Sequence, residues 1–205
     1  MTNKNIKSVL RLSESLEDLS EPIDLYILFI DLCDSTKIKQ YCLEESIPDS
    51  IWIMRLKVFL SRTSRIIQQY KGTIVKTIGD EVMATFAFDL EPEQIIKCVI
   101  EVFQTFENLK SYNKGLFKIK SKASIDFGVC YDGQLLTPQV IDPIGPAVDR
   151  CARLGKFVNY NEIIFSEAFK ATLEEKNFDF KKYKIIDGSE EMKGLGKVDY
   201  RKIIL

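Results

Sequence analysis

The sequence predicts an α+β fold with a ferredoxin-like core, in which helices flank a central sheet that is mostly antiparallel. Two observations predict this fold. Apolar periodicity along the chain gives the order β-α-α-β-β-α-β-(α)-β-α-β-β, and two of the strands meet at a tight turn. The length of 205 residues suits one domain, and 45% hydrophobic and 29% charged residues are ordinary for a globular protein.

The first predicted strand, residues 24–30, carries apolar side chains on both of its faces. One face holds Tyr26, Leu28 and Ile30, and the other holds Leu25, Ile27 and Phe29. This pattern predicts a central strand that is covered on both sides or buried at an interface. The polar residues 1–23 before it are expected to form a loosely packed N-terminal arm, which leaves residues 24–205 for the folded domain.

Two long helices with a hairpin between them are predicted next. Apolar side chains repeat at helical spacing in both helices, and Pro92 suits the first turn of the second. The hairpin strands meet at Gly79-Asp80, where glycine supplies a positive φ and the turn holds a carboxylate at the rim of the sheet. The predicted ranges are 50–70 for the first helix, 73–77 and 81–86 for the strands, and 92–112 for the second helix.

The second half of the chain is predicted to alternate strands with short helices. Its first strand, residues 119–131, leads through the turn Asp132-Gly133 to a returning arm at 135–141. One apolar helix face is formed by Val148, Cys151, Ala152 and Leu154. The remaining elements are a strand at 162–166, a helix at 167–175, and strands at 183–186 and 198–205 on either side of a turn at 192–197.

The residue types present exclude several classes of site. There is no His, and the five Cys residues lack C-x-x-C spacing, which argues against zinc and rules out Ser-His-Asp and Cys-His catalysis. A formal net charge of -1 gives no reason to expect nucleic acid as a partner, so the short basic segments 62–65 and 117–122 are interpreted as solvated faces. The odd Cys count and the lack of a signal peptide favour a cytoplasmic protein, and no apolar run reaches the ~18 residues of a membrane span.

Two carboxylates stand at strand ends in the predicted fold. Asp31 directly follows the first strand, and Asp80 lies at the hairpin turn. Two such side chains can bind a hard divalent cation such as Mg²⁺, which takes oxygen ligands and shares them with phosphates. Ser35 and Thr36 begin the next helix, where free backbone N–H groups bind phosphate; simple capping of that helix is the alternative. These residues predict a two-Asp metal site that handles a nucleoside triphosphate.

Two motifs resemble those of the class III nucleotide cyclases. LFIDLCDST, residues 28–36, is similar to the first metal motif of that family, and VKTIGDEVMATF, residues 75–86, is similar to the second. The resemblance extends over residues 24–205 and implies the class III cyclase fold. It also implies conversion of a nucleoside triphosphate into a 3',5'-cyclic nucleotide and pyrophosphate, with two Mg²⁺ or Mn²⁺ ions per site held by Asp31, Asp80 and the carbonyl of Leu32. The alternative is that each Asp only caps a turn.

Further site residues follow from the resemblance alone. Arg153, in GPAVDRCAR, matches the family's transition-state arginine, with Arg150 as a competing candidate. Lys193, in MKGLGKVDY, matches the triphosphate-binding lysine, and an ordinary turn residue is the alternative. Two positions depart from the family: Asp149 replaces the Asn that positions the ribose, and Asp34 replaces a Gly beside the triphosphate. Asp34 is expected to repel the phosphates unless it points away or binds metal.

Base selection is expected to depend on Lys76 and Asp142, which match the family's pair that recognises adenine. That pair favours ATP as the substrate. Against it, the segment VDRCAR, residues 148–153, resembles the compact pyrimidine cyclases of bacterial anti-phage (Pycsar) systems, and a cytosine amino group could use the same Asp. We therefore favour a pyrimidine cyclase, which makes cUMP from UTP or cCMP from CTP, over an adenylate cyclase, which makes cAMP. The sequence identifies neither the activating signal nor the effector that reads the product.

Lys76 and Asp80 share one hairpin but serve opposite ends of a nucleotide in the family. Its members resolve this with a head-to-tail dimer, in which each site takes metals from one subunit and the base-reading, Arg and Lys side chains from the other. The resemblance therefore implies a homodimer with two composite sites. A non-catalytic nucleotide-binding module is the alternative of another class, because Asp34 and Asp149 break the family pattern. A diguanylate cyclase would carry a G-G-[DE]-E-F signature, which residues 78–82 do not supply.

Overall fold

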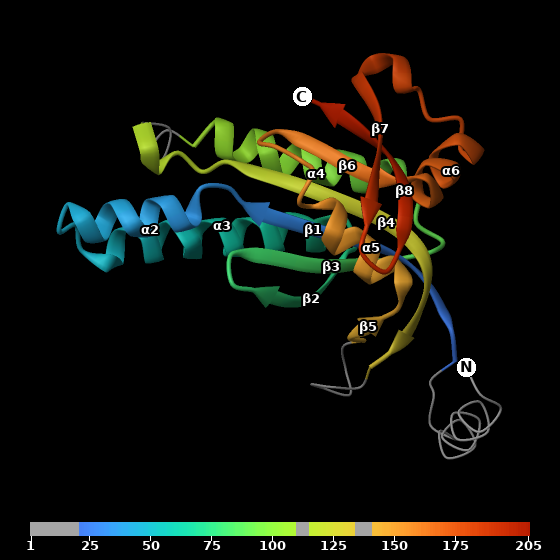
Figure 1. The fold of residues 1–205 in the computed structure, drawn as a ribbon, viewed down its shortest axis with the longest axis horizontal. Helices are drawn as coiled ribbons and strands as arrows, with labels where there is room; N and C mark the ends of the chain where they lie inside the picture. The colour runs from blue at the N-terminus through green and yellow to red at the C-terminus, as the bar shows by residue number, and fades with distance from the viewer. Residues whose placement is uncertain (1–20, 110–114, 134–140) are drawn as a thin grey trace.

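The computed structural model describes residues 21–109, 115–133 and 141–205 (Figure 1). The predicted N-terminal arm at 1–23 and the returning arm at 135–141 lie almost entirely outside these residues. The strands are β1 (Ile23–Leu32), β2 (Thr73–Ile78), β3 (Glu81–Ala87), β4 (Ser121–Asp132), β5 (Pro143–Ile144), β6 (Glu162–Ser166), β7 (Lys184–Met192) and β8 (Gly196–Ile204). The α-helices are α2 (Ser35–Glu44), α3 (Asp49–Gln69), α4 (Glu93–Glu107), α5 (Pro146–Leu154) and α6 (Glu167–Glu175), with short 3₁₀ turns at Gly115–Phe117 and Phe180–Lys182.

The described strands form one 8-stranded sheet in the order β2-β3-β1-β4-β6-β8-β7, with β5 paired to β4. Neighbouring strands are antiparallel except for β4 and β6, which run parallel. Helices α3, α4 and α6 pack on one face of the sheet, and α5 packs on the other (Figure 1). The predicted α+β fold, with a sheet rich in antiparallel pairs between helices, is confirmed. No helix in the described ranges is both long and apolar enough to cross a membrane.

β1 is the central strand that its two apolar faces predicted. It lies between β3 and β4, and every residue from Leu25 to Ile30 is buried. Ile30 packs into the core under α3 and α4, whereas Phe29 packs on the side of α5. The strand continues to Leu32, so Asp31 is its second-last residue and is held by strand pairing rather than by a loop.

The hairpin of β2 and β3 forms at the predicted place. Gly79 has a φ of 66° in its turn, a conformation that glycine adopts without steric cost. Gly72 is needed for the approach to the hairpin, because a Cβ there would lie 2.5 Å from Ile67 and 2.7 Å from Phe86. The end of α3 can therefore pack closely on β3, and this packing fixes the direction in which the hairpin leaves the helix.

The bounds of three elements, α4, β7 and β8, differ from the prediction. α4 ends at Glu107, five residues before the predicted end, because Asn108 favours a helix terminus and Leu109 closes a tighter turn by donating to the Phe106 carbonyl (3.2 Å). β7 and β8 are longer than predicted and leave only Lys193 to Leu195 as their turn. Most of β7 is exposed at the sheet edge, so backbone pairing with β8 defines it, and apolar periodicity does not.

The buried face of α5 also differs from the prediction. The buried residues are Ala147, Cys151 and Leu154, which recur at helical spacing, whereas Ala152 is exposed and Val148 is half-buried. The helix begins at Pro146, so its rotation brings Ala147 to the sheet. Cys151 and Leu154 fit the prediction, the half-buried Val148 packs against the same core as Cys151, and Ala152 does not fit.

Candidate active site

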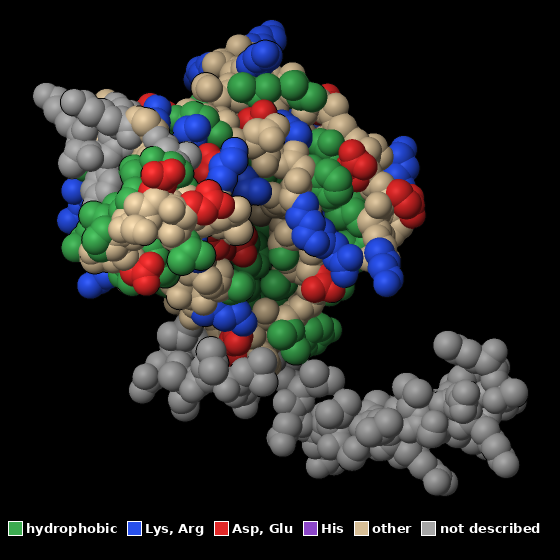
Figure 2. All heavy atoms as spheres, turned by 60° about the vertical axis from the view of Figure 1, so that its left-hand side comes forward, with side chains coloured by type: hydrophobic (Ala, Val, Ile, Leu, Met, Phe, Trp, Pro, Cys, Tyr) green, Lys and Arg blue, Asp and Glu red, His purple; other side chains and the backbone are tan. Residues whose placement is uncertain are grey.

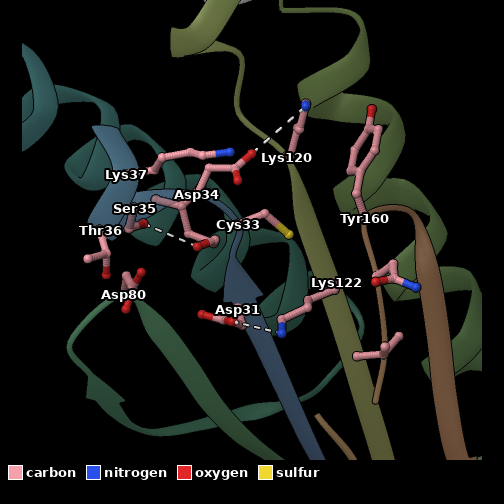
Figure 3. Close-up of a pocket in the computed structure, with 13 residues that line it drawn as sticks. Asp31, Cys33, Asp34, Ser35, Thr36, Lys37, Asp80, Lys120, Lys122 and Tyr160 are labelled. Carbon is pink, nitrogen blue, oxygen red and sulfur yellow. Dashed lines mark hydrogen bonds and ion pairs between the residues drawn. The ribbon is translucent and has the colours of Figure 1, made fainter. Parts of the chain in front are cut away.

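The segment between β1 and the first turn of α2 brings one acidic residue, Asp34, and two hydroxyl-bearing residues, Ser35 and Thr36, to one edge of the sheet. Asp34, the N-cap residue of α2, has a φ of 63°, a left-handed conformation that is uncommon outside glycine. Its carboxylate points toward Lys120, with 3.9 Å between Oδ2 and Nζ (Figure 3). The Ser35 hydroxyl donates to the Leu32 carbonyl (3.1 Å), and no side chain in the described residues caps α2. Simple capping by Ser35 or Thr36 is therefore wrong.

The hairpin turn lies against the end of β1. The backbone N–H of Leu32 donates to the Asp80 carbonyl (3.2 Å), which ties the turn to the strand that carries Asp31. Asp31 and Asp80 line one open cavity of about 740 Å³, together with Leu32, Ser35, Thr36, Lys37 and Lys122. The surface is hollowed at this end of the molecule, and acidic and basic side chains gather around the hollow (Figure 2). The two sequence motifs therefore meet at one site.

The charges around Asp31 are crowded. In strand register Asp31 faces Glu81 on one side and Lys122 on the other, and Lys122 Nζ lies 3.5 Å from its carboxylate (Figure 3). Burial raises the pKa of Asp31, Lys122 opposes that rise, and Asp80 adds to it. Burial and the nearby Asp31 raise the pKa of Glu81 to about 7. A bound divalent cation would relieve the repulsion among these carboxylates.

The donor atoms in this cavity fit a hard divalent cation. Asp31 and Asp80 supply carboxylate oxygens, and the Leu32 carbonyl keeps one lone pair beyond the bond from Ser35. Across the described residues, no three or more His, Cys, Asp or Glu side chains are grouped to hold a metal alone. This suits Mg²⁺, which binds through one or two carboxylates and completes its shell with water and substrate phosphate.

The predicted base and ribose positions lie in a second cavity of about 830 Å³, on the α5 side of the hairpin. Lys76, Asp149 and the Gly194-Leu195 turn line it. Lys76 Nζ donates to the buried Asp142 carboxylate at 2.7 Å. The two residues predicted to read the base are thus paired with each other.

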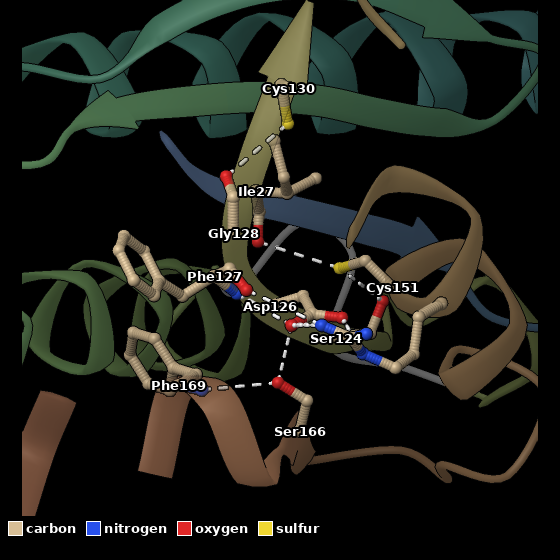
Figure 4. A network of polar contacts seen from close by, with 10 residues as sticks. Ile27, Ser124, Asp126, Phe127, Gly128, Cys130, Cys151, Ser166 and Phe169 are labelled. Carbon is tan, nitrogen blue, oxygen red and sulfur yellow. Dashed lines mark hydrogen bonds and ion pairs between the residues drawn. The ribbon is translucent and has the colours of Figure 1, made fainter. Parts of the chain in front are cut away.

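The two candidate arginines have different surroundings. Arg153 donates to the Lys193 carbonyl (2.6 Å), which brings the end of α5 to the β7–β8 turn beside the second cavity. Arg150 is bound to Asp126, with 2.7 Å between Nε and Oδ2. Asp126 is fully buried in a network with Ser166 (Figure 4). Because Arg150 is committed to that network, Arg153 is the better candidate to meet a substrate.

The predicted residues therefore form two groups in one chain. The metal and phosphate group, Asp31, Leu32, Ser35, Thr36 and Asp80, lines the first cavity. The second group lies in or beside the other cavity and contains Lys76, Asp142, Asp149, Arg153 and Lys193. The structure does not bring the two groups together within one copy of the chain.

Sequence reasoning missed the basic side of the first cavity. Segment 117–122 was interpreted as a solvated face, but Lys120 and Lys122 line the cavity, and Lys122 also donates to the Gly155 carbonyl (2.9 Å). That interpretation is wrong because β1 and β4 pair antiparallel, which sets Lys122 opposite Asp31. The alternating pattern of β4 was visible, but the register between distant strands is not encoded locally.

Solved structures with this fold are nucleotide cyclase domains. The guanylyl cyclase Cya2 has a TM-score of 0.73 at 16% identity, covering 90% of this chain and 93% of that chain. The adenylyl cyclase CyaB from P. aeruginosa has a TM-score of 0.69 at 20% identity, with 90% and 95% covered. A non-canonical dimeric guanylyl cyclase domain of the RhoGC fusion protein from the aquatic fungus Blastocladiella emersonii has a TM-score of 0.67 at 14% identity, with 90% and 98% covered. At these identities the likeness establishes the shared fold.

Two sequence comparisons concern the family, and the match to a family model establishes it. A uridylate cyclase from Rhodovulum sp. (strain MB263) is 27% identical over 143 residues, which are 64% of this chain and 58% of that protein, so the match spans little more than half the length of the relative. The model of the adenylate and guanylate cyclase catalytic domain matches residues 20–202, nearly the whole chain. The resemblance seen in the two metal motifs is thereby confirmed. The chain belongs to the family of adenylate and guanylate cyclase catalytic domains, the class III nucleotide cyclases.

Proposed function

We propose that this chain converts a nucleoside triphosphate into a 3',5'-cyclic nucleotide and pyrophosphate, using two Mg²⁺ or Mn²⁺ ions per site. The observation that carries the proposal is the meeting of Asp31 and Asp80, from two separate motifs, in one cavity beside the start of α2. Both carboxylates face the same open space, which supports a role beyond the capping of a turn (Figure 3).

The residues of the first cavity have distinct roles in this proposal. Asp31, Asp80 and the Leu32 carbonyl hold the metals, which when bound lower the pKa of the attacking 3'-hydroxyl and neutralise phosphate charge. The backbone N–H groups at Ser35 and Thr36 bind phosphate at the start of a helix that no side chain of the described residues caps. Asp34 turns its carboxylate to Lys120, which reduces the repulsion expected from a third acidic residue.

The remaining roles require a second copy of the chain. Lys76 and Asp142 read the base, Asp149 contacts the ribose, and Arg153 and Lys193 stabilise the charge on the phosphates. These residues lie in or beside a cavity separate from the metal cavity. A head-to-tail homodimer would join the metal cavity of one subunit to the second cavity of its partner, giving two composite sites. A solved guanylyl cyclase domain with the same fold is described as a non-canonical dimer, which supports self-association of such domains but gives no support to this particular arrangement.

We favour a pyrimidine substrate. The 27% identity to a uridylate cyclase supports UTP and cUMP, and the likeness of segment 148–153 to Pycsar cyclases supports cUMP or cCMP in anti-phage signalling. The second candidate is an adenylate cyclase, which the paired Lys76 and Asp142 favour, since this pair reads adenine in the family. Both candidates share the chemistry and differ only at the base.

Incubation of the pure protein with each of the four nucleoside triphosphates and Mn²⁺, followed by mass spectrometry, tests the proposal. We expect cUMP or cCMP as the main product, and no product from Asp31→Asn or Asp80→Asn, which remove a ligand charge without removing a core contact. Robust formation of cAMP as the sole product would refute the pyrimidine substrate and would still support the nucleotide cyclase reaction. Tight nucleotide binding without any cyclic product would instead favour a non-catalytic module.

A further inference from the structure

Arg55 is a buried cation directly behind the metal loop. It lies on α3, and only 2% of its surface is exposed. Its guanidinium donates to three backbone carbonyls: Nη2 to Cys33 (3.1 Å) and Lys118 (2.9 Å), and Nε to Phe117 (3.3 Å). In the part of the chain that the structure describes, no carboxylate forms an ion pair with it.

The carbonyls that accept from Arg55 belong to backbone segments that lead into the wall of the first cavity. Cys33 lies between Asp31 and Asp34, and its N–H donates to the Lys120 carbonyl (2.8 Å), so this peptide segment is held from two sides. Lys118 leads into the start of β4, which brings Lys120 and Lys122 to the same cavity. One guanidinium therefore joins α3 to both backbone segments that form the cavity wall.

Stability alone gives a weak reason for a charged side chain at this position. Burial of a charge is unfavourable unless it is paired, and an apolar residue of similar size would pack without that desolvation cost. Burial lowers the pKa of Arg55, and the negative charges of Asp34 and Asp80 oppose that change. The planar guanidinium can hold several carbonyls at once, which neither an apolar side chain nor a lysine reproduces.

We propose that Arg55 is a positioning residue of the metal site, which holds the backbone of the β1–α2 loop in the geometry that a divalent cation requires. This rests on the proposed function, in which Asp31 and Asp80 bind that cation. Outer residues that orient metal ligands typically contribute 10–100-fold to metal affinity. The positive charge itself acts in the opposite direction, because it repels a cation bound at the neighbouring carboxylates.

Titration of Mn²⁺ into the full chain without nucleotide separates the positioning of the loop backbone by Arg55 from the repulsion of the cation by its charge. Arg55→Lys keeps the positive charge but loses the planar guanidinium that donates to several carbonyls, whereas Arg55→Met loses both the charge and the donors. We expect about tenfold weaker Mn²⁺ binding by Arg55→Lys and by Arg55→Met. The matched control is Phe59→Leu, one turn further along the same helix at a fully buried position, which should lower the melting temperature and leave Mn²⁺ affinity unchanged.

Several results would overturn the proposal. If only the charge matters, Arg55→Met binds Mn²⁺ more tightly and Arg55→Lys binds it like the wild type. If Arg55→Met fails to fold, Arg55→Lys decides alone, and a folded Arg55→Lys protein with wild-type Mn²⁺ affinity refutes the positioning role. Equal weakening in Phe59→Leu would assign the effect to general stability. Absence of Mn²⁺ binding in the wild type would overturn the metal assignment of the proposed function itself, a result distinct from all of these.

Discussion

Asp34 combines a backbone requirement with an electrostatic one. Its φ of 63° costs most side chains about 1 kcal/mol, whereas Asp and Asn tolerate it through local hydrogen bonds. Its carboxylate faces Lys120 at 3.9 Å, so the extra negative charge at the cavity is partly compensated. The departure from the family's glycine therefore preserves the shape of the loop and alters only its charge.

Substitutions at this position should separate shape from charge. Asp34→Gly is expected to leave the free energy of unfolding nearly unchanged, because glycine adopts the left-handed conformation freely. Asp34→Ala should lose about 1 kcal/mol, because its Cβ is strained there. Urea unfolding of both variants measures the difference. Equal stability of the two would show that the loop does not need this conformation.

The proposed base-reading pair, Lys76 and Asp142, allows a second test at the scale of single residues. Changing Lys76 to Gln or Asp142 to Asn should reduce kcat/KM for the preferred nucleotide by roughly tenfold to a hundredfold relative to the other three. The reason is that a lost partner leaves a buried polar group of the matched base unpaired. Competition assays with all four nucleotides give the ratio directly, and a uniform loss on every nucleotide would remove this pair from the base pocket.

At the scale of elements, one buried carboxylate fixes the orientation of α5. Asp126 of β4 pairs with Arg150 of α5 and accepts from the Ser166 hydroxyl (2.5 Å), which itself caps α6. Burial raises the pKa of Asp126, and Arg150 opposes that rise. Figure 4 shows this network. Since α5 also carries Asp149 and Arg153, the network helps to fix the positions of both residues.

Loss of this carboxylate should be costly. Asp126→Asn is expected to lower the free energy of unfolding by about 3 kcal/mol, because Arg150 then lacks its counter-charge in a mostly buried site. The control is Asp187→Asn, which breaks the exposed pair with Arg201 and should cost less than about 1 kcal/mol. Chemical denaturation compares the two, and similar losses would refute a special role for the buried pair.

Local signals predicted most of these elements. The alternation in β1 and the glycine turn at Gly79 are encoded in neighbouring residues, and β6 and α6 appear at their predicted bounds. The predicted strand at 183–186 ends before β7 does, because the exposed side chains of β7 show no apolar periodicity. The burial of Arg55 is not predicted by its residue type, because a charged side chain favours an exposed position, although Arg55 lies four residues before the buried Phe59 on the same helix.

At the scale of the whole molecule, the candidate site residues are divided between two separate cavities. The meeting of Asp31 and Asp80 in one cavity is predictable because both motifs end strands that meet at one edge. The place of Lys122 is not predictable locally, because it depends on the register of β1 with β4. The family resemblance predicts that the proposed base-reading residues lie apart from the proposed metal ligands, and Lys76 and Asp149 line a different cavity from Asp31 and Asp80. How two copies meet is not encoded in any single motif.

Co-expression of Asp80→Ala with Arg153→Ala tests the composite site most directly. Each variant alone should be inactive, because every site in its homodimer lacks one essential group. In the mixture about half of the dimers are heterodimers with one intact site of two, so about a quarter of wild-type activity should return. Recovery of that activity, measured as cyclic nucleotide formed per dimer, is the result we predict; verified heterodimers without activity would contradict the shared-site account.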